Sequence, residues 1–260
     1  MAVITLTTDF GTRDWFAGTM KGVILRINPR ATLVDLTHDI PAGDIRGAAF
    51  ALAAAWRFFP RGTIHVAVVD PGVGSARKAI AVQTPDCVFV GPDNGLLSLA
   101  LAGQKIVAIR RLENEKFFLK PLSRTFHGRD IFAPVAGHLS RGVSLKKFGP
   151  ESKTFEKLDW PQPRRRGNRL EGEVIYLDRF GNAITNIADQ LLAGTKHLAT
   201  CEVFGKHRRI CPLKDFYQAV PTNQPVALFG SSGYLEIAVN GGSAAKTLGL
   251  ELGTPVVLHW

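Results

Sequence analysis

Hydrophobic positions in the first half of the chain alternate between short apolar runs and runs with helical spacing. Residues 3–8 and 32–37 are short and rich in β-formers, and residues 63–69 are almost continuously apolar, as in a strand buried on both faces. Between these runs, residues 14–27 place apolar side chains at helical intervals, and residues 43–59 are rich in alanine. This alternation predicts a parallel sheet with right-handed crossover helices.

The rest of the N-terminal half continues the pattern in shorter pieces. Strands are expected at 79–83, 88–90 and 106–109, with a short helix after Pro92-Asp93-Asn94-Gly95 and a last helix starting near Arg129. Between about 149 and 172 the periodicity ends in a stretch that contains two prolines and three consecutive arginines. We therefore predict an α/β N-terminal domain over residues 1–150 and a linker over residues 151–169.

Beyond the linker the pattern changes to short strands without long helices, separated by Gly, Asn and Pro. This pattern predicts a smaller all-β domain over residues 170–260, a barrel or a sandwich. The expected strands cover residues 173–177, 183–187, 201–204, 226–229, 234–238 and 256–259.

Composition supports a folded chain that does not span a membrane. Apolar residues make up 45% and charged residues 21% of the sequence, which suits a packed core. The longest apolar run, residues 48–56, is too short to cross a bilayer. Residues 1–3 lead directly into a predicted strand without a signal-peptide pattern, so we expect a cytoplasmic protein. Three cysteines without metal-type spacing fit ordinary reduced thiols.

The chain is basic, with 32 Lys and Arg against 22 Asp and Glu and a net charge of +10. A basic balance can indicate a nucleic-acid partner. The one dense run here, Arg164-Arg165-Arg166 with Arg169, is flanked by prolines and lacks interleaved aromatic residues. We interpret it as a solvated linker and expect no nucleic-acid partner.

Acidic residues follow three of the predicted parallel strands. Asp9 ends the first, Asp35 and Asp39 lie at the end of the second, and Asp70 ends the third. Ligands of open α/β sheets bind at the edge formed by the strands' carboxyl ends. We therefore expect the acidic strand ends to face one crevice. His38, between two of these acids, is interpreted as a capping or core histidine.

Two further polar segments belong to the same half of the chain. Pro71-Gly72-Val73-Gly74-Ser75-Ala76-Arg77 places an arginine seven residues after Asp70 across a glycine-rich turn, without the Lys-Ser/Thr ending of a phosphate-binding loop. A surface salt bridge and a functional pair are both compatible with this spacing. His127, next to Gly128 and before a predicted helix, is accessible enough to titrate or to hold water.

Two turn sequences in the β domain carry polar side chains beside aromatic ones. They are Asp178-Arg179-Phe180-Gly181-Asn182 and Gly230-Ser231-Ser232-Gly233-Tyr234. Hairpin turns explain the Gly and Asn residues. They do not explain Phe180, whose ring in an exposed turn could stack on a base.

Nine motifs follow one another along the chain. They are Thr8-Asp9-Phe10-Gly11 with Asp14, Met20-Lys21-Gly22-Val23-Ile24, Val34-Asp35-Leu36-Thr37-His38, Phe59-Pro60-Arg61-Gly62-Thr63, Val68-Val69-Asp70-Pro71-Gly72-Val73-Gly74, Pro92-Asp93-Asn94-Gly95, Thr125-Phe126-His127-Gly128-Arg129-Asp130, Phe180-Gly181-Asn182 and Ser231-Ser232-Gly233-Tyr234-Leu235. In this order they resemble the S-adenosylmethionine hydroxide adenosyltransferase family, the hydrolases related to fluorinase and chlorinase. The resemblance covers nearly the whole chain.

The resemblance implies a reaction, an assembly and a domain arrangement. The implied reaction converts S-adenosyl-L-methionine (SAM) and water to adenosine and L-methionine by attack at the ribose C5′. Family members have an α/β N-terminal and a β C-terminal domain, and they form homotrimers whose sites lie between neighbouring subunits. The resemblance implies no metal and no added cofactor.

It also implies roles for individual residues. Asp70, Arg77 and His127 would position and activate the water. Asp9 would bind the ribose hydroxyls, Asn182 would contact adenine and Phe180 would pack on it. Asp178 and Ser231 would hold the amine and carboxylate of methionine. The remaining implied substrate contacts are Asp14, Phe126 and Asn240.

Three differences from the halogenating relatives favour water as the nucleophile. Those relatives have a tyrosine at the position of Asp70, lack the histidine equivalent to His127, and in fluorinase carry an inserted loop that is absent after Pro92-Asp93-Asn94-Gly95-Leu96. Ser232 occupies the position of a fluorinase arginine, so the contact to the methionine carboxylate departs from that pattern.

Two other functions are compatible with the residues alone. A metal-dependent phosphoesterase could use Asp9, Asp14, His38, Asp39 and Asp70, because carboxylates at strand ends suit a divalent ion. A non-catalytic module that binds adenosine or nucleic acid would fit the basic charge.

Overall fold

The computed structural model describes residues 2–192 and 200–260, which fold as two compact units. The first unit spans residues 1–158 and the second spans residues 159–260. The expected linker is partly structured, because residues 164–166 form a strand that pairs within the second unit. Its three side chains are exposed, and this explains why a run of arginines showed no strand periodicity.

The first unit is built on a six-stranded mixed sheet with the order β2-β1-β3-β5-β4-β6. The first four strands in this order run parallel, whereas β4 is antiparallel to both of its neighbours. The strands are β1 (Val3–Thr8), β2 (Thr32–Thr37), β3 (Thr63–Val68), β4 (Ala79–Gln83), β5 (Cys87–Pro92) and β6 (Ala108–Arg111).

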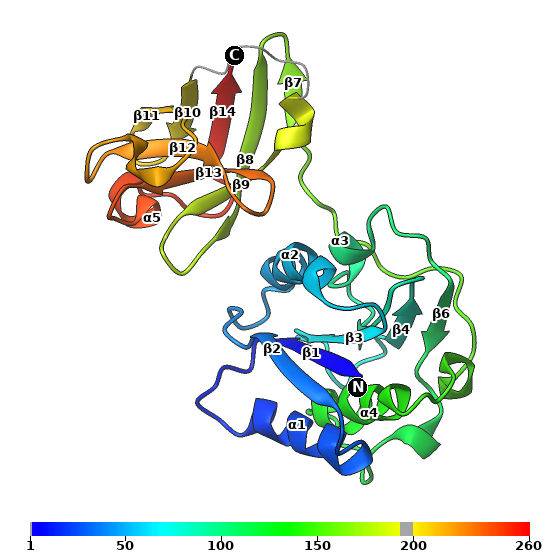
Figure 1. Cartoon of the computed structure of the whole chain (residues 1–260). Coiled ribbons are helices and arrows are strands. Elements are labelled where there is room, and N and C mark those ends of the chain that lie inside the picture. The colour runs from blue at the N-terminus through cyan, green and yellow to red at the C-terminus, as the bar shows by residue number, and fades with distance from the viewer. Residues whose placement is uncertain (1, 193–199) are drawn as a thin grey trace. The chain divides into compact units, whose positions relative to one another are not determined.

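Helices cover both faces of this sheet (Figure 1). On one face, α1 (Phe16–Ile27) and α4 (Ala133–Ser140) bury Met20, Ile24 and their neighbours against β1 and β3. On the other face, α2 (Ile45–Ala55) and α3 (Ser98–Leu101) form a second core. A π-helical turn, Gly128–Phe132, precedes α4. The short 3-10 turns of this unit are Trp56–Phe58, Glu115–Phe117 and Leu145–Phe148.

The antiparallel direction of β4 determines which residues lie together at one edge of the sheet. β3 and β5 are parallel, so residues 69–70 and 93–94 follow their carboxyl ends at that edge. Ala79, the first residue of β4, pairs with Pro92, the last residue of β5. The antiparallel strand therefore begins where its neighbours end, and Arg77 lies beside Asp70 because of this reversal.

The second unit is an eight-stranded antiparallel sheet with the order β11-β10-β14-β8-β9-β13-β12, and β7 pairs with β8. An isolated bridge between Leu213 and Ala227 and a hydrogen bond from Lys214 N to Ala227 O (2.9 Å) link its two ends. The sheet is thus a nearly closed barrel around one apolar core. Its strands are β7 (Arg164–Arg166), β8 (Arg169–Leu177), β9 (Ala183–Ala188), β10 (Thr200–Phe204), β11 (Arg208–Pro212), β12 (Pro225–Phe229), β13 (Tyr234–Val239) and β14 (Pro255–His259).

Only short helices accompany the barrel in the described residues. They are the helix α5 (Ala244–Leu248) and the 3-10 turns Asp189–Leu192 and Tyr217–Ala219. The predicted fold class, an α/β domain followed by an all-β domain, is confirmed. Across residues 2–192 and 200–260, none of the helices has the length and apolar character needed to cross a bilayer.

Candidate active site

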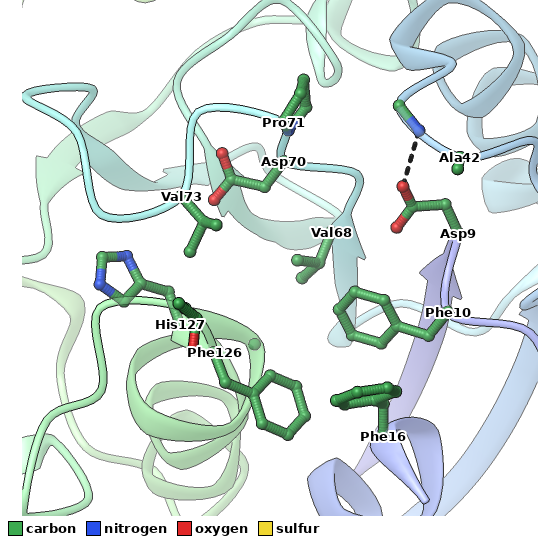
Figure 2. Close-up of a pocket in the computed structure, with 13 residues that line it drawn as sticks. Asp9, Phe10, Phe16, Ala42, Val68, Asp70, Pro71, Val73, Phe126 and His127 are labelled. Atoms are coloured by element: carbon green, nitrogen blue, oxygen red, sulfur yellow. Dashed lines mark hydrogen bonds between the residues drawn. The ribbon is translucent and has the colours of Figure 1, made fainter. Parts of the chain in front are cut away.

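A cavity of about 540 Å³ opens at the sheet edge of the first unit, where β1 and β3 end. It brings together residues from four segments that are far apart in the sequence (Figure 2). Asp9 and Asp70 end two neighbouring strands, and His127 comes from the loop before the π-helical turn. The lining residues are Asp9, Phe10, Phe16, Ala42, Gly43, Val68, Asp70, Pro71, Val73, Thr125, Phe126, His127 and Gly128.

Asp70 and Arg77 form a bidentate ion pair beside the cavity. The Arg77 Nε donates to both carboxylate oxygens of Asp70, at 3.0 and 2.9 Å, and its Nη2 donates to Oδ2. The side chains are only 5% and 11% exposed, respectively, so this is not the surface salt bridge that the spacing also allowed. A guanidinium in this fork geometry fixes the carboxylate plane.

His127 joins this pair through the same guanidinium. Arg77 Nη2 lies 2.8 Å from His127 Nδ1. Because a guanidinium has only N–H donors, Nδ1 is the acceptor and the neutral ring carries its proton on Nε2. Burial and then the Arg77 charge lower the pKa of His127, against smaller opposing effects of Asp70 and Asp130. His127 is therefore neutral at pH 7.

Asp9 and a group of aromatic rings form the other walls of the cavity (Figure 2). Asp9 Oδ2 accepts a hydrogen bond from Gly43 N at 2.8 Å, and the carboxylate lines the cavity. Phe126 packs edge-on against Phe10 and Phe16, with ring centroids 5.8 and 5.2 Å apart. The cavity therefore has acidic groups beside a large apolar surface.

The prediction that the acids after the second strand would face the same crevice is wrong. Asp35 forms a salt bridge with Lys21 and lies 3.0 Å from Nε2 of His38, and neither Asp35 nor Asp39 lines the cavity. β2 is the edge strand, so its end lies away from β3. His38 is buried and its Nδ1 bonds Thr8 Oγ1 at 2.7 Å, as expected for a core histidine.

The second unit has its own cavity, of about 1020 Å³. Five of its lining residues were expected from the sequence to contact substrate, namely Asp178, Phe180, Asn182, Ser231 and Asn240. Phe180 is 77% exposed, and Asn182 is buried. Asp14 is exposed and lines neither cavity.

Asp178 has a local structural task in addition to any ligand contact. Its Oδ1 accepts from the backbone N of Phe180 and Asn182, at 2.9 and 2.8 Å, and its Oδ2 accepts from Asn182 Nδ2 at 3.0 Å. The carboxylate therefore shapes the turn that presents Phe180 and Asn182 to the cavity.

Comparison with known protein families identifies both halves of the chain. Residues 4–149 match the model of the SAM hydroxide adenosyltransferase N-terminal domain, and residues 172–257 match that of the C-terminal domain. The chain belongs to the SAM hydroxide adenosyltransferase family.

Named relatives of this family member include both hydrolases and halogenases. It is 40% identical over 265 residues to an (R)-S-adenosyl-L-methionine hydrolase from Thermus thermophilus, covering 99% of this chain and 100% of the relative. A hydrolase of the same name from Methanocaldococcus jannaschii is 35% identical, with 96% and 92% covered. A fluorinase from an Actinoplanes species is 26% identical, with 98% and 97% covered.

The fold of this family member is also found in solved structures. A crystal structure of an uncharacterized conserved protein from Thermotoga maritima superposes with a TM-score of 0.92 at 36% identity and covers 100% of both chains. A conserved hypothetical protein from Thermus thermophilus superposes with a TM-score of 0.80 at 39% identity, covering 99% of this chain and 100% of that one.

The structure of this family member adds one acidic residue that the sequence analysis missed. Glu236 lines the second cavity from β13 and is only 6% exposed. Tyr217 Oη donates to Glu236 Oε1 at 2.8 Å. Burial raises the pKa of Glu236, and Asp178 raises it further. A glutamate within an otherwise apolar predicted strand was the available signal, because isolated buried carboxylates are costly.

The described residues of this family member do not provide the metal ligands that a metal-dependent phosphoesterase would need. Within residues 2–192 and 200–260, no group of three or more His, Cys, Asp or Glu side chains is arranged to hold a metal ion. Asp70 is bound to Arg77 and His38 lies between Thr8 and Asp35, so these side chains do not converge.

Proposed function

We propose that this protein hydrolyses SAM to adenosine and L-methionine, with water attacking the ribose C5′. The observation that carries the proposal is the joint placement of Asp70, Arg77 and His127 at a cavity that also contains Asp9. The (R)-SAM hydrolases that match nearly the whole chain support it. Because those relatives are named for the (R) form, the (R) epimer at sulfur is the substrate that we propose.

The chemistry requires a positioned water more than a strong acid. The sulfonium leaves as a neutral thioether, so the leaving group needs no proton. Water is a weak nucleophile, and orienting it in line with the C5′–S bond is the main contribution open to the protein. Removal of its proton adds typically ~10²–10⁴-fold. We infer that no metal or cofactor takes part.

The hydrogen bonds assign different tasks to the three residues. His127 uses Nδ1 to accept from Arg77, so its Nε2–H is a donor that can hold the water oxygen. Arg77 cannot give up its proton, and it holds the Asp70 carboxylate in place through Nε and Nη2. Asp70 is then the group able to accept the water proton. Water loses H⁺ to Asp70 while its oxygen bonds C5′ and the C5′–S electron pair passes to sulfur.

The remaining substrate contacts divide between the two cavities. Asp9, with one oxygen held by Gly43, suits the ribose hydroxyls, and Phe126 adds an apolar wall. In the second cavity Asn182 and Phe180 suit adenine, while Asp178 and Glu236 suit the methionine ammonium, with Ser231 and Asn240 nearby. We propose a cytoplasmic homotrimer in which the first cavity of one subunit and the second cavity of its neighbour form one site.

Labelled water tests the reaction directly. The protein is incubated with (R)-SAM and, separately, (S)-SAM in H₂¹⁸O, with and without chloride or fluoride. We expect adenosine that carries ¹⁸O at its 5′ oxygen, unlabelled methionine and no halogenated nucleoside. Label in a methionine-derived product, or no adenosine from either epimer, would overturn the proposal.

Substitutions test the assigned roles. We expect Asp70→Ala and His127→Ala to lower kcat roughly 10²–10⁴-fold with little change in SAM affinity, because both act in the transition state. Asp9→Ala should mainly weaken binding, because its ribose hydrogen bonds are lost. Steady-state kinetics and calorimetric binding separate the two effects. Asp39→Asn, an exposed strand-end acid outside the cavity, is the matched control and should leave both values unchanged.

A further inference from the structure

The turn Asp93-Asn94-Gly95 lies at the same sheet edge as the first cavity but does not line it. It follows β5, whose last residue pairs with the first residue of β4. The turn therefore lies behind the loop of residues 70–77, which joins β3 to β4 and carries Asp70 at one end and Arg77 at the other.

Hydrogen bonds connect this turn to both ends of that loop. Asn94 Nδ2 donates to the carbonyl oxygen of Val69 at 2.9 Å. The backbone N of Asp93 donates to the carbonyl oxygen of Lys78, also at 2.9 Å. Val69 immediately precedes Asp70, and Lys78 immediately follows Arg77. One turn thus holds the peptide groups next to both members of the ion pair.

The turn is itself fixed from its outer side. Asp93 Oδ1 accepts from Glu156 N at 2.7 Å, and Asn94 Oδ1 accepts from Leu96 N at 3.2 Å. Gly95 has a φ of +93°, and a Cβ there would lie 2.9 Å from the Leu158 side chain. A turn that is anchored in this way can serve as a fixed reference for a more exposed loop.

The loop has few such anchors of its own. Its internal bonds, Val73 N to Asp70 O and Ser75 N to Gly72 O, both 3.1 Å, define local turns. They do not set the direction in which the Asp70 carboxylate leaves β3. The direction of Asp70 is set at the peptide group that joins Val69 to Asp70. The hydrogen bond from Asn94 holds the carbonyl of this peptide, on the fully buried Val69.

We propose that Asn94 is a positioning residue, whose side-chain amide holds the Val69 carbonyl and so fixes Asp70 and Arg77 relative to His127. The proposal rests on the proposed hydrolase function for its effect on rate. Loss of the donor leaves a buried carbonyl unpaired and lets the end of β3 shift. Displacements of about 1 Å at a reacting centre can cost ~10²-fold in rate.

Two substitutions separate the amide donor from the rest of the side chain. Asn94→Asp keeps the shape and the acceptor for Leu96 N but loses the donor to Val69 O, and Asn94→Ala loses both. We expect both variants to lower kcat roughly 10- to 100-fold while KM changes by less than about threefold. Full activity in Asn94→Asp with a loss only in Asn94→Ala would assign the effect to the turn and overturn the proposal.

Asn114 provides a matched control in the same unit. Its Nδ2 donates to a distant carbonyl, Lys147 O, at 2.8 Å, and its Oδ1 accepts from Lys116 N at 3.3 Å, so the geometry resembles that of Asn94. It lies in neither cavity lining. Asn114→Asp and Asn114→Ala should keep kcat within about twofold, with assays run well below each variant's Tm. Equal losses at both positions would indicate a general effect of stability and contradict the proposal.

A double variant tests whether Asn94 acts through Asp70. In an Asp70→Asn background, adding Asn94→Asp should cause little further loss of kcat, because residues that act as a unit are not additive. Multiplicative losses would show that Asn94 acts elsewhere.

The His127 ring provides a readout that does not depend on turnover. Arg77 lowers the pKa of His127 more than Asp70 raises it. If the ion pair moves, NMR titration of the ring should show a higher pKa in Asn94→Ala than in the unmodified protein or Asn114→Ala. If the unmodified protein fails to hydrolyse SAM but this shift occurs, the proposed function fails and the positioning role stands. An unchanged His127 pKa together with an unchanged kcat would overturn the positioning role.

Discussion

At the scale of single residues, Arg77 determines the chemistry of its two neighbours. It binds Asp70 through Nε and Nη2, and it donates through Nη2 to His127 Nδ1. The same guanidinium therefore orients a carboxylate and, together with burial, lowers the pKa of the His127 imidazole at the edge of one cavity. A lysine in its place could supply charge but not this fork of donors.

The protonation state of His127 leads to a prediction for the pH dependence. Its pKa is lowered from the ordinary value of 6.5, so the neutral ring persists as the pH falls through 6.5 and is lost only below it. We expect kcat/KM to stay level between pH 8 and 6.5 and to decrease at lower pH, because protonated Nδ1 repels Arg77. A pH profile with (R)-SAM measures this, and the residual activity of His127→Gln should lack that step. An acid limb with its midpoint above pH 6.5 would contradict the assignment.

At the scale of elements, two loops must stay in register for the three residues to meet. One is the 70–77 loop between β3 and β4, and the other leads to His127. Gly74 (φ +77°) lies where they touch, and a Cβ there would be 2.3 Å from the Arg124 carbonyl oxygen. This contact sets how closely the glycine-rich loop approaches the segment that carries His127.

We predict that Gly74→Ala separates the loops and lowers kcat by at least about 10-fold. Gly103→Ala is the matched control, because Gly103 also has a positive φ (+70°) but nothing lies within 4 Å of its added Cβ. Both variants should lose about 1–2 kcal/mol of unfolding free energy for the left-handed conformation, measured by urea denaturation, and Gly74→Ala should lose more because of its contact with Arg124 O. Only Gly74→Ala should also lower kcat. Equal kcat values in the two variants would contradict the prediction that the contact at Gly74 keeps the two loops in place.

At the scale of the whole molecule, the proposed substrate contacts belong to two separate folding units. Asp70 and His127, which we propose to act on the water, line the cavity of the first unit, and the residues proposed to bind adenine and methionine line that of the second. Each unit has its own apolar core. A site shared between subunits, as we propose, would combine one cavity from each of two neighbours.

The proposed trimer predicts complementation between inactive variants. Asp70→Asn inactivates the first cavity and Asn182→Ala weakens the second, so mixing and refolding them together should restore about a quarter of the sites, each built from the two intact halves. Activity of the mixture is compared with that of each variant refolded alone, and native mass spectrometry gives the subunit number. A mixture no more active than the sum of its parts would contradict sites shared between subunits.

Much of the fold followed from local patterns. The bounds of β1, β2 and β4 agree with the predicted ranges, because their apolar runs end at polar or glycine-rich turns. β7 and β11 were not predicted. They are largely exposed strands rich in arginine, and each pairs with a strand adjacent to it in the sequence, β7 with β8 and β11 with β10. Exposed edge strands carry little hydrophobic periodicity, so sequence alone gives no signal for them.

The sequence by itself determined the two fold classes, the family resemblance and the choice of Asp9, Asp70, Arg77 and His127, because motif order and apolar periodicity are local properties of the chain. Tertiary structure decided which of these groups meet. The reversal of β4 brings Arg77 to Asp70, and the edge position of β2 leaves Asp35 with Lys21 and His38. Burial made Glu236 relevant, and the hydrogen bond to the buried Val69 made Asn94 relevant. Such contacts join residues distant in sequence, so only the folded chain determines them.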